Sequence, residues 1–353
     1  MTMRRRPLGR SGIEVSELCL GSMTWGSQNT DAEAASQLDL ALERGVNFID
    51  TAEMYPTTPL RPETMGATER AIGRWLERSG RRDDVVIATK VLGNGRPKLD
   101  GGGDIDGEKL RASLEGSLRR LGTDTIDLYQ LHWPNRGSYH FRQNWRFDPS
   151  AQRGKYARER VRENVREVLA TCEALIEEGK LRAVGLSNES AWGIVQFLDV
   201  AERNGLPRVA SVQNEYNLLN RLFDTDLAEL AHHEDVGLLA YSPLAAGILS
   251  GKYADGAVPE GSRRALNERL GGRWTRRSAE AAERYATLAR EHGLEPARLA
   301  LAFCLSRPFM TSVIVGATDV EQLETNLGAV DVTLSESLLD AIGALHREYP
   351  MPM

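Results

Sequence analysis

Four polar residues in the first half of the chain follow short apolar runs and carry side chains suited to proton transfer. They are Asp50 after VNFI, Tyr55 five positions later, Lys90 after VVIAT, and His132 after TIDLYQL. Apolar runs of this length are typical of buried strands. In a parallel barrel all strands end at one rim, so residues about 40 positions apart in sequence can line one pocket. We therefore predict that the four residues form an active site.

These side chains together could donate a proton to a carbonyl oxygen. A tyrosine has an ordinary pKa of about 10, so it is protonated at neutral pH but is a weak acid. Lys90 could lower that pKa and stabilise the phenolate, with Asp50 to hold the ammonium. His132 could hydrogen bond to the carbonyl oxygen or share in proton transfer. Each residue alone is more simply a cap, a surface aromatic, a solvated strand end or a core histidine, and only the set favours chemistry.

Composition limits the classes of partner. The chain has 353 residues, 41% of them hydrophobic, and a formal net charge of -6. An acidic balance disfavours nucleic acids and anionic membranes as partners and favours a small soluble ligand. No linker rich in Pro, Gly or Ser divides the chain, so residues 1–353 are predicted to be a single domain. Either a monomer or an oligomer fits this charge.

Cysteine usage and the N-terminus predict a cytoplasmic protein. Cys19, Cys172 and Cys304 are far apart and lie among apolar or helix-forming residues, which indicates reduced core thiols. The N-terminal RRR is not followed by the apolar region of an export signal. The stretch VGLLAYSPLAAGILSG is too short and too polar to cross a bilayer.

Strand-like and helical segments alternate along the whole chain. Strands are predicted to end near Gly21, Asp50, Lys90, Leu131, Ser187, Gln213, Tyr241 and Val315. Helices are predicted over 30–44, 65–79, 107–120, 160–179, 190–203, 225–233, 278–291, 296–306, 319–328 and 335–346, the first capped by Thr30 or Asp31. This alternation favours an α/β protein built as a (β/α)8 TIM barrel. A doubly wound sheet is the competitor, but the first turn, LGSMTWGSQNTD, lacks its glycine fingerprint.

Several segments depart from the alternation. LGRSGIEVS predicts an N-terminal β-hairpin that closes the bottom of the barrel. Long connections over 133–159 and 242–277 follow strands, so we expect them on the catalytic face. The first is rich in aromatics and arginines and is expected to cover a substrate, although a loop without function is the alternative. GNGRPKLDGGGD, after Lys90, is predicted to be a flexible loop.

NFIDTAEMY, IATK and DLYQLHWP resemble the motifs that supply the Asp, Tyr, Lys and His tetrad of the aldo-keto reductase superfamily. The similarity continues through VGLSNES, VQNEYNLLN, AYSPLAAGILSGKY and VGATDVEQLETNL, and so covers essentially the whole chain. Within the superfamily the chain is most similar to bacterial Tas-type reductases, and it shares features with β-subunits of voltage-gated potassium channels. The resemblance implies a barrel that binds NADPH without a Rossmann domain and transfers hydride to a small-molecule aldehyde or ketone.

The resemblance also implies a role for each site residue. Tyr55 is the general acid, Lys90 and Asp50 tune it, and His132 orients the carbonyl group. The positions matching cofactor contacts are Ser22, Met23, Asp50, Ser187, Asn188, Gln213, Tyr241, Ser242, Pro243, Leu244, Gly247, Leu249, Lys252, Arg263, Gly316, Ala317, Thr318, Gln322 and Asn326. Among them, Tyr241 matches the aromatic that stacks on the nicotinamide. Lys252 and Arg263 match basic positions that favour NADPH, although Arg263 could simply be solvated.

The chain departs from the family pattern at a few positions. Thr325 stands where many members have Glu, which bears on one adenine contact. Ser22 and Met23 replace a more usual Thr and aromatic residue. Trp25 and Trp133 are predicted to shape the substrate pocket with Tyr55 and His132.

Two other functions remain open at this point. One is an NADPH-binding regulatory or interaction subunit with little turnover. The other is a metal-dependent hydrolase, with Asp50, Glu53, Asp127 and His132 as ligands. Lysine and tyrosine are not metal ligands by preference, so no metal is predicted.

Overall fold

The computed structural model describes residues 3–95, 99, 102–152 and 155–353. Eight parallel strands close into a barrel in the order β10-β3-β4-β5-β6-β7-β8-β9. The strands are β3 (Leu18–Gly21), β4 (Phe48–Asp50), β5 (Val86–Val91), β6 (Ile126–Leu131), β7 (Leu181–Ser187), β8 (Val209–Glu215), β9 (Gly237–Tyr241) and β10 (Met310–Val315). The predicted barrel is confirmed. The doubly wound alternative is wrong, because β10 pairs with β3 and the sheet has no open edge.

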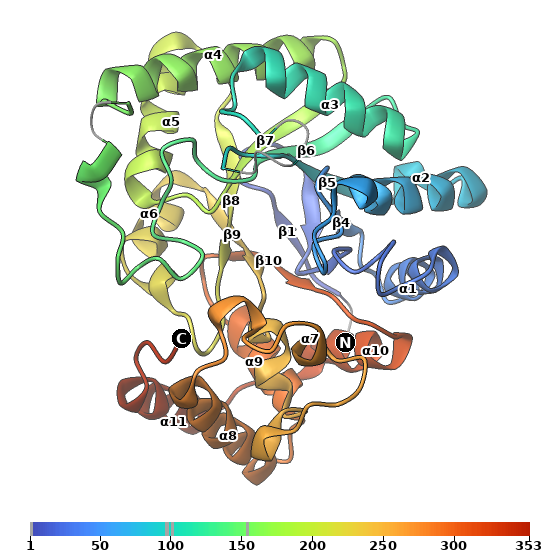
Figure 1. Ribbon diagram of the computed structural model, residues 1–353, viewed down its shortest axis with the longest axis vertical. Helices are drawn as coiled ribbons and strands as arrows, with labels where there is room; N and C mark the ends of the chain where they lie inside the picture. The colour runs from blue at the N-terminus through green and yellow to red at the C-terminus, as the bar shows by residue number, and fades with distance from the viewer. Residues whose placement is uncertain (1–2, 96–98, 100–101, 153–154) are drawn as a thin grey trace.

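The helices lie around the outside of the barrel (Figure 1). They are α1 (Asp31–Glu43), α2 (Ala67–Ser79), α3 (Gly107–Leu121), α4 (Arg158–Glu177), α5 (Ala191–Asn204), α6 (Asp226–Glu234), α7 (Arg263–Leu266), α8 (Arg276–Glu291), α9 (Pro296–Leu305), α10 (Val320–Leu327) and α11 (Glu336–Glu348). Every predicted helix is present. The short α7 was not predicted, because a single turn has no hydrophobic period to detect.

Local signals explain where these elements begin and end. The Thr30 hydroxyl accepts a hydrogen bond from Glu33 N at 3.3 Å, so Thr30 caps α1 and Asp31 is its first residue. Strand β5 runs one residue beyond Lys90, because Val91 pairs with Leu131 of β6. Strand β8 runs two residues beyond Gln213, because Glu215 pairs with Tyr241 of β9.

An N-terminal hairpin covers the end of the barrel where the strands begin, as predicted. Its strands β1 (Arg5–Pro7) and β2 (Glu14–Ser16) are antiparallel. Leu8, Ile13 and Val15 are buried and pack with inward-facing Phe48 and Val86 at the start of the barrel strands. The hairpin therefore closes the barrel floor with apolar side chains.

Strand alternation divides the barrel interior into an apolar and a polar layer. Successive side chains of a strand point to opposite faces, so residues two apart share the interior. Phe48 and Asp50 on β4, and Ala88 and Lys90 on β5, follow this pattern. The lower residue of each pair is apolar, whereas the upper one is charged. The polar layer thus lies at the carboxyl ends of the strands.

Two long connections lie beyond these strand ends. Residues 132–157 join β6 to α4 and residues 242–275 join β9 to α8. The expected loop GNGRPKLDGGGD lies partly outside the described residues. In the part of the chain that the structure describes, no helix has both the length and the apolar character that a membrane crossing requires.

Asp127 lies at the end of the barrel where the strands begin, and it tests what holds that end together. Its Oδ2 accepts hydrogen bonds from Ile87 N and Arg82 Nη2, both at 2.8 Å, and its Oδ1 accepts one from Arg182 Nη1 at 2.6 Å. This carboxylate is 2% exposed and links β5, β6 and β7. Asp127→Ala leaves a buried N–H without its acceptor, so we expect it to lower the free energy of unfolding by about 2 kcal/mol.

Chemical denaturation measures this change. The matched control is Arg276→Ala, which breaks a 2.8 Å pair with Glu280 in which Arg276 is 91% exposed. The control is expected to cost less than about 0.5 kcal/mol. Equal losses in the two variants would show that burial of Asp127 does not matter.

Candidate active site

A buried ion pair occupies the polar layer at the top of the barrel. Lys90 Nζ donates to Asp50 Oδ2 at 2.7 Å and to Thr51 O at 2.6 Å. The Lys90 side chain is fully buried and that of Asp50 is 4% exposed. A buried ammonium requires such partners, because desolvation of an isolated charge costs several kcal/mol. The structure therefore brings together two of the four residues that the sequence singles out.

Asp50 is also held by neutral donors on other strands. Its Oδ1 accepts hydrogen bonds from Gln213 Nε2 at 2.7 Å and Gln130 Nε2 at 3.3 Å. Its backbone carbonyl accepts one from Ser22 Oγ at 2.7 Å. Gln130 was not predicted. It lies two residues before His132, and side chains two apart on a strand point to the same face, so this spacing could have indicated it.

Tyr55 and His132 lie above this pair. Lys90 Nζ is 4.9 Å from the centroid of the Tyr55 ring. The rings of Tyr55 and His132 meet edge to face, with centroids 5.8 Å apart and planes at 71°. Trp133 follows, with its ring centroid 4.8 Å from that of His132. All four predicted catalytic residues thus converge at one end of the barrel, with Trp133 at their side.

The electrostatic balance differs from the expectation for Tyr55. Burial raises the pKa of Tyr55 above its ordinary value, and the opposing effect of the Lys90 charge is smaller. Burial by itself lowers the pKa of Lys90, but the charge and hydrogen bond of Asp50, together with the charges of Tyr55 and Cys19, outweigh it, and the pKa of Lys90 is raised. Lys90 is therefore cationic at neutral pH, and Tyr55 keeps its proton.

A second group of predicted residues forms a hydrogen-bonded chain beside the tetrad. Tyr241 OH donates to Asn188 Oδ1 at 2.7 Å, and Asn188 Nδ2 donates to His132 O at 2.9 Å. Ser187 Oγ donates to Gln213 O at 2.9 Å. Asn188 has a positive φ of 53°, a conformation that asparagine tolerates better than most residues. These side chains come from the ends of β7, β8 and β9, so they share one wall of the site.

The connection after β9 makes a tight series of turns next to that wall. Ser242 and Gly247 have φ values of 51° and 94°. A Cβ placed on Gly247 would lie 2.8 Å from Lys252 Cε, so glycine permits the close approach of the lysine. Arg263, further along, contacts Met23 Sδ at 3.5 Å. Pro243 and Leu249 are buried, and Leu249 packs into the hydrophobic core.

The remaining predicted cofactor residues surround the start of α10. Asp319 caps this helix by accepting a hydrogen bond from Gln322 N at 2.8 Å. Gln322 Nε2 donates to Thr318 Oγ1 at 2.9 Å. Gly316 is exposed and Asn326 is buried. This group is separate from the hydrogen-bonded chain around the tetrad and follows the strand β10.

The structure differs from the interpretation of the sequence at Trp25, and it separates the residues of the metal-site alternative. Trp25 does not line a pocket: its side chain is fully buried, and its Nε1 donates to Gln37 Oε1 of α1 at 3.1 Å. The alternative metal site is not formed either. Asp127 lies at the opposite end of the barrel and Asp50 is paired with Lys90. Among the described residues, no three His, Cys, Asp or Glu side chains are placed to hold a metal ion.

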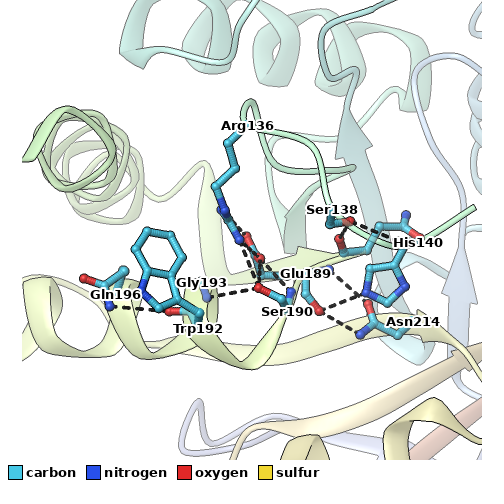
Figure 2. A network of polar contacts seen from close by, with 10 residues as sticks. Arg136, Ser138, His140, Glu189, Ser190, Trp192, Gly193, Gln196 and Asn214 are labelled. Carbon is cyan, nitrogen blue, oxygen red and sulfur yellow. Dashed lines mark hydrogen bonds and ion pairs between the residues drawn. The ribbon is translucent and has the colours of Figure 1, made fainter. Parts of the chain in front are cut away.

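A buried network ties the connection after β6 to this wall (Figure 2). Arg136 forms two hydrogen bonds with the Glu189 carboxylate, one of them at 3.1 Å. Glu189 is 2% exposed. Ser138 Oγ donates to Asn188 O at 2.8 Å, and His140 Nε2 donates to Glu189 O at 3.1 Å. The network holds the backbone on both sides of Asn188 and so fixes the amide that contacts Tyr241.

The pKa of Tyr55 can be measured directly. We expect a value above 10 in the wild type, because burial outweighs Lys90. Lys90→Met should raise it further, because the cation that favours the phenolate is removed. NMR titration of 13C-labelled tyrosine follows each phenol, and Tyr55→Phe identifies the resonance. A wild-type value below 10, or a fall in Lys90→Met, would contradict this balance.

Gly193 tests the network of Figure 2. A Cβ at this position would overlap Glu189 Oε1 and Arg136 Nη2. Gly-to-Ala changes inside helices usually stabilise by up to about 1 kcal/mol. Gly193→Ala should instead lower the free energy of unfolding by about 1 kcal/mol, as overpacking does. It should also speed hydrogen exchange of the amides of residues 134–142.

The matched control for this test is Gly343→Ala in α11. There the nearest atom, Arg347 Nη1, is 3.7 Å from the position that the added methyl group would take, which is ordinary contact. The control should be neutral or stabilising. If both alanine variants behaved alike, the buried Arg136–Glu189 pair would not constrain this helix.

Comparison with known proteins agrees with this arrangement. The profile of the Aldo/keto reductase family matches residues 17–347. Protein tas of Escherichia coli K12 is 42% identical over 359 aligned positions, covering 99% of each chain. The uncharacterized oxidoreductase YrpG of Bacillus subtilis 168 is 33% identical, covering 94% of this chain and 92% of the relative.

A plant protein is similar over the same length. A "Probable voltage-gated potassium channel subunit beta" of Oryza sativa subsp. japonica is 34% identical, covering 99% of this chain and 98% of the relative. The predicted resemblance to the Tas-type and channel-subunit branches is therefore confirmed. From the profile match and these relatives, the chain belongs to the aldo/keto reductase family of oxidoreductases.

Proposed function

We propose that the protein is an NADPH-dependent reductase of aldehydes or ketones. The observation that carries this proposal is the position of the Lys90 ammonium, which is paired with Asp50 and lies against the face of the Tyr55 ring. Burial raises the pKa of Tyr55, so this phenol keeps its proton at neutral pH. The neighbouring ammonium stabilises the phenolate that forms when the proton leaves.

The residues around the tetrad suit a dinucleotide phosphate. The turns at Ser242 and Gly247 leave little room for side chains and present backbone amides, a common arrangement at phosphate sites. Lys252 and Arg263 supply positive charge. Burial lowers the pKa of Lys252, and the nearby charge of Arg263 lowers it further. Bound phosphates would relieve that repulsion. Gly316, Thr318 and Gln322 at the start of α10 would hold the adenine end.

The nicotinamide end is expected at the wall of Asn188, Gln213 and Tyr241. The amides of Asn188 and Gln213 can hydrogen bond to a carboxamide, and Tyr241 offers a flat ring for stacking. When bound, the reduced cofactor supplies the hydride. Tyr55 then gives its proton to the carbonyl oxygen, and His132 orients that oxygen. Lys90 stabilises the phenolate until solvent restores the proton.

The substrate is expected between Tyr55, His132 and Trp133. Phe141, from the same connection as Trp133, meets the Trp133 ring with centroids 6.0 Å apart and forms the outer part of this wall. We infer a small soluble carbonyl compound as substrate, and a cytoplasmic protein that acts as one domain.

A second candidate function comes from the plant relative named as a potassium channel subunit. The protein could then bind NADPH as a regulatory subunit and turn over little. The Asp, Tyr, Lys and His residues of the tetrad are all present, which favours the reductase, because residues needed only for turnover have no role in a binding subunit.

Tyr55→Phe separates the two functions. It should lower kcat for aldehyde reduction by more than about a hundredfold, since general acid catalysis contributes that much. Its Kd for NADPH should stay close to that of the wild type, because the ring remains. NADPH absorbance and NADPH fluorescence measure the two quantities. Tyr285→Phe, at a buried tyrosine of α8 that is not among the predicted site residues, is the control and should keep its activity.

The opposite results are equally informative. A Tyr55→Phe protein that reduces aldehydes at the wild-type rate would exclude Tyr55 as the proton donor. Tight NADPH binding with no turnover by the wild type, over a panel of aldehydes, dicarbonyls and ketones, would favour the regulatory subunit.

A further inference from the structure

Glu215, the last residue of β8, binds arginines from both long connections of the catalytic face. Arg273, from the connection after β9, donates to its two oxygens through Nε at 2.6 Å and Nη2 at 2.9 Å. Arg142, from the connection after β6, donates to Oε2 through Nη1 at 3.2 Å. The Glu215 side chain is 3% exposed and the arginines are 13% and 19% exposed. The two connections therefore meet at one buried carboxylate.

Arg142 directly follows the residue that forms the outer wall of the proposed substrate pocket. Phe141, the preceding residue, contacts the Trp133 ring that stands next to His132. Phe141 and Arg142 both have positive φ values, 57° and 63°. Strained backbone of this kind persists where the surroundings hold it, and it is common at ligand sites. On its other side, Arg142 is close enough to Tyr241 for the two groups to interact electrostatically.

Positive charge exceeds negative charge next to this pocket. Arg263 is close enough to Tyr55, and Arg142 and Arg273 are close enough to Tyr241, for their charges to interact. Among the described residues, Glu215 is the one carboxylate within 4.0 Å of Arg142 or Arg273, and none is that close to Arg263. Burial lowers the pKa of Arg142 and of Arg263, and the charge of Arg273 lowers each further. An anion bound here would relieve this repulsion.

Two sources could supply the anion. Arg263 lies on the connection that carries the proposed cofactor residues and contacts Met23, so a cofactor phosphate can neutralise it. Arg142 comes from the other connection, beside the aromatic wall of the substrate pocket. A guanidinium has five N–H donors, and one hydrogen bond to Glu215 leaves others for a ligand. These donors belong to the connection that also carries the aromatic wall of Trp133 and Phe141.

We propose that the protein prefers carbonyl substrates that also carry an anionic group, a carboxylate or a phosphate, and that Arg142 selects them. The inference rests on the proposed carbonyl reduction. Glu215 is a positioning residue in this account. It holds Arg142 next to the substrate pocket with one hydrogen bond, while the two hydrogen bonds from Arg273 neutralise most of the Glu215 charge. Guanidinium groups suit carboxylates and phosphates through paired hydrogen bonds.

The test compares pairs of aldehydes in which one member carries an anionic group and the other is neutral. 4-Carboxybenzaldehyde and its methyl ester form one pair, and glyceraldehyde 3-phosphate and glyceraldehyde form a second, which separates carboxylate from phosphate. For the wild type with NADPH, we expect kcat/KM to be about tenfold or more higher for the anionic member of at least one pair, as a charge-assisted hydrogen bond supplies. The ratio should fall as salt concentration rises.

Arg142→Gln should bring this ratio close to one, and Arg142→Lys should keep part of it. The matched control is Arg146→Gln, which removes the same charge from an exposed position on the same connection and should leave the ratio unchanged. The Kd for NADPH of Arg142→Gln should stay within about twofold of the wild type, because its lost contact is to substrate.

Each opposing outcome has a distinct meaning. A wild type that reduces neutral and anionic aldehydes equally well, at low and high salt, would overturn the inference and leave the reductase standing. Weaker NADPH binding in Arg142→Gln, with equal losses for both aldehydes, would assign the charge to the cofactor and also overturn it. No turnover of any aldehyde would overturn the proposed function and the inference with it. The salt dependence of the wild type decides the matter even if a variant does not fold.

Discussion

The ion pair between Lys90 and Asp50 is the interaction on which the rest of the site depends. A charged lysine in the middle of a barrel is tolerated only with a carboxylate and further hydrogen-bond partners at hand. Asp50 and Thr51 O are these partners of Lys90, and Gln130 and Gln213 hold Asp50 in turn from two other strands. The pair in turn places a positive charge below the Tyr55 ring. Folding of the barrel therefore also places the Lys90 ammonium next to the Tyr55 ring.

The barrel and its connections contribute in different ways. The strands bring the tetrad together by alternation, over an apolar floor that the N-terminal hairpin completes. The connections after β6 and β9 close over that layer and meet at Glu215. A second buried glutamate, Glu189, ties the connection after β6 to the Asn188 backbone (Figure 2). Two buried carboxylates thus anchor the loops to strand ends.

The sequence predicts the strands, the helices and the residues at the strand ends, because these follow patterns that repeat along the chain. Buried strands of a parallel barrel are runs of apolar residues that stop at one rim, so Asp50, Lys90 and His132 could be found by their position after such runs. The helices follow from their period and from caps such as Thr30. Family resemblance then supplied roles that spacing alone does not, for example at Ser187 and Gln213.

Other features depend on contacts between distant residues and could not be predicted. Trp25 follows a strand end like Trp133 does, yet its indole finds a partner in Gln37 of α1 and is buried. The pairing of Arg142 and Arg273 with Glu215 depends on the path of two irregular connections. The pKa of Tyr55 depends on how deeply its ring is buried, because burial raises this pKa by more than the Lys90 charge lowers it. Composition and spacing carry none of this information.

A double-mutant cycle on the buried pair tests the central claim most directly. The kcat for aldehyde reduction would be measured at saturating NADPH for wild type, Asp50→Asn, Lys90→Met and the double variant. If Asp50 acts by holding Lys90, the double variant should be no slower than Lys90→Met, within about twofold, because coupled residues are not additive. Losses that multiply would show that Asp50 and Lys90 act independently, and would contradict the account.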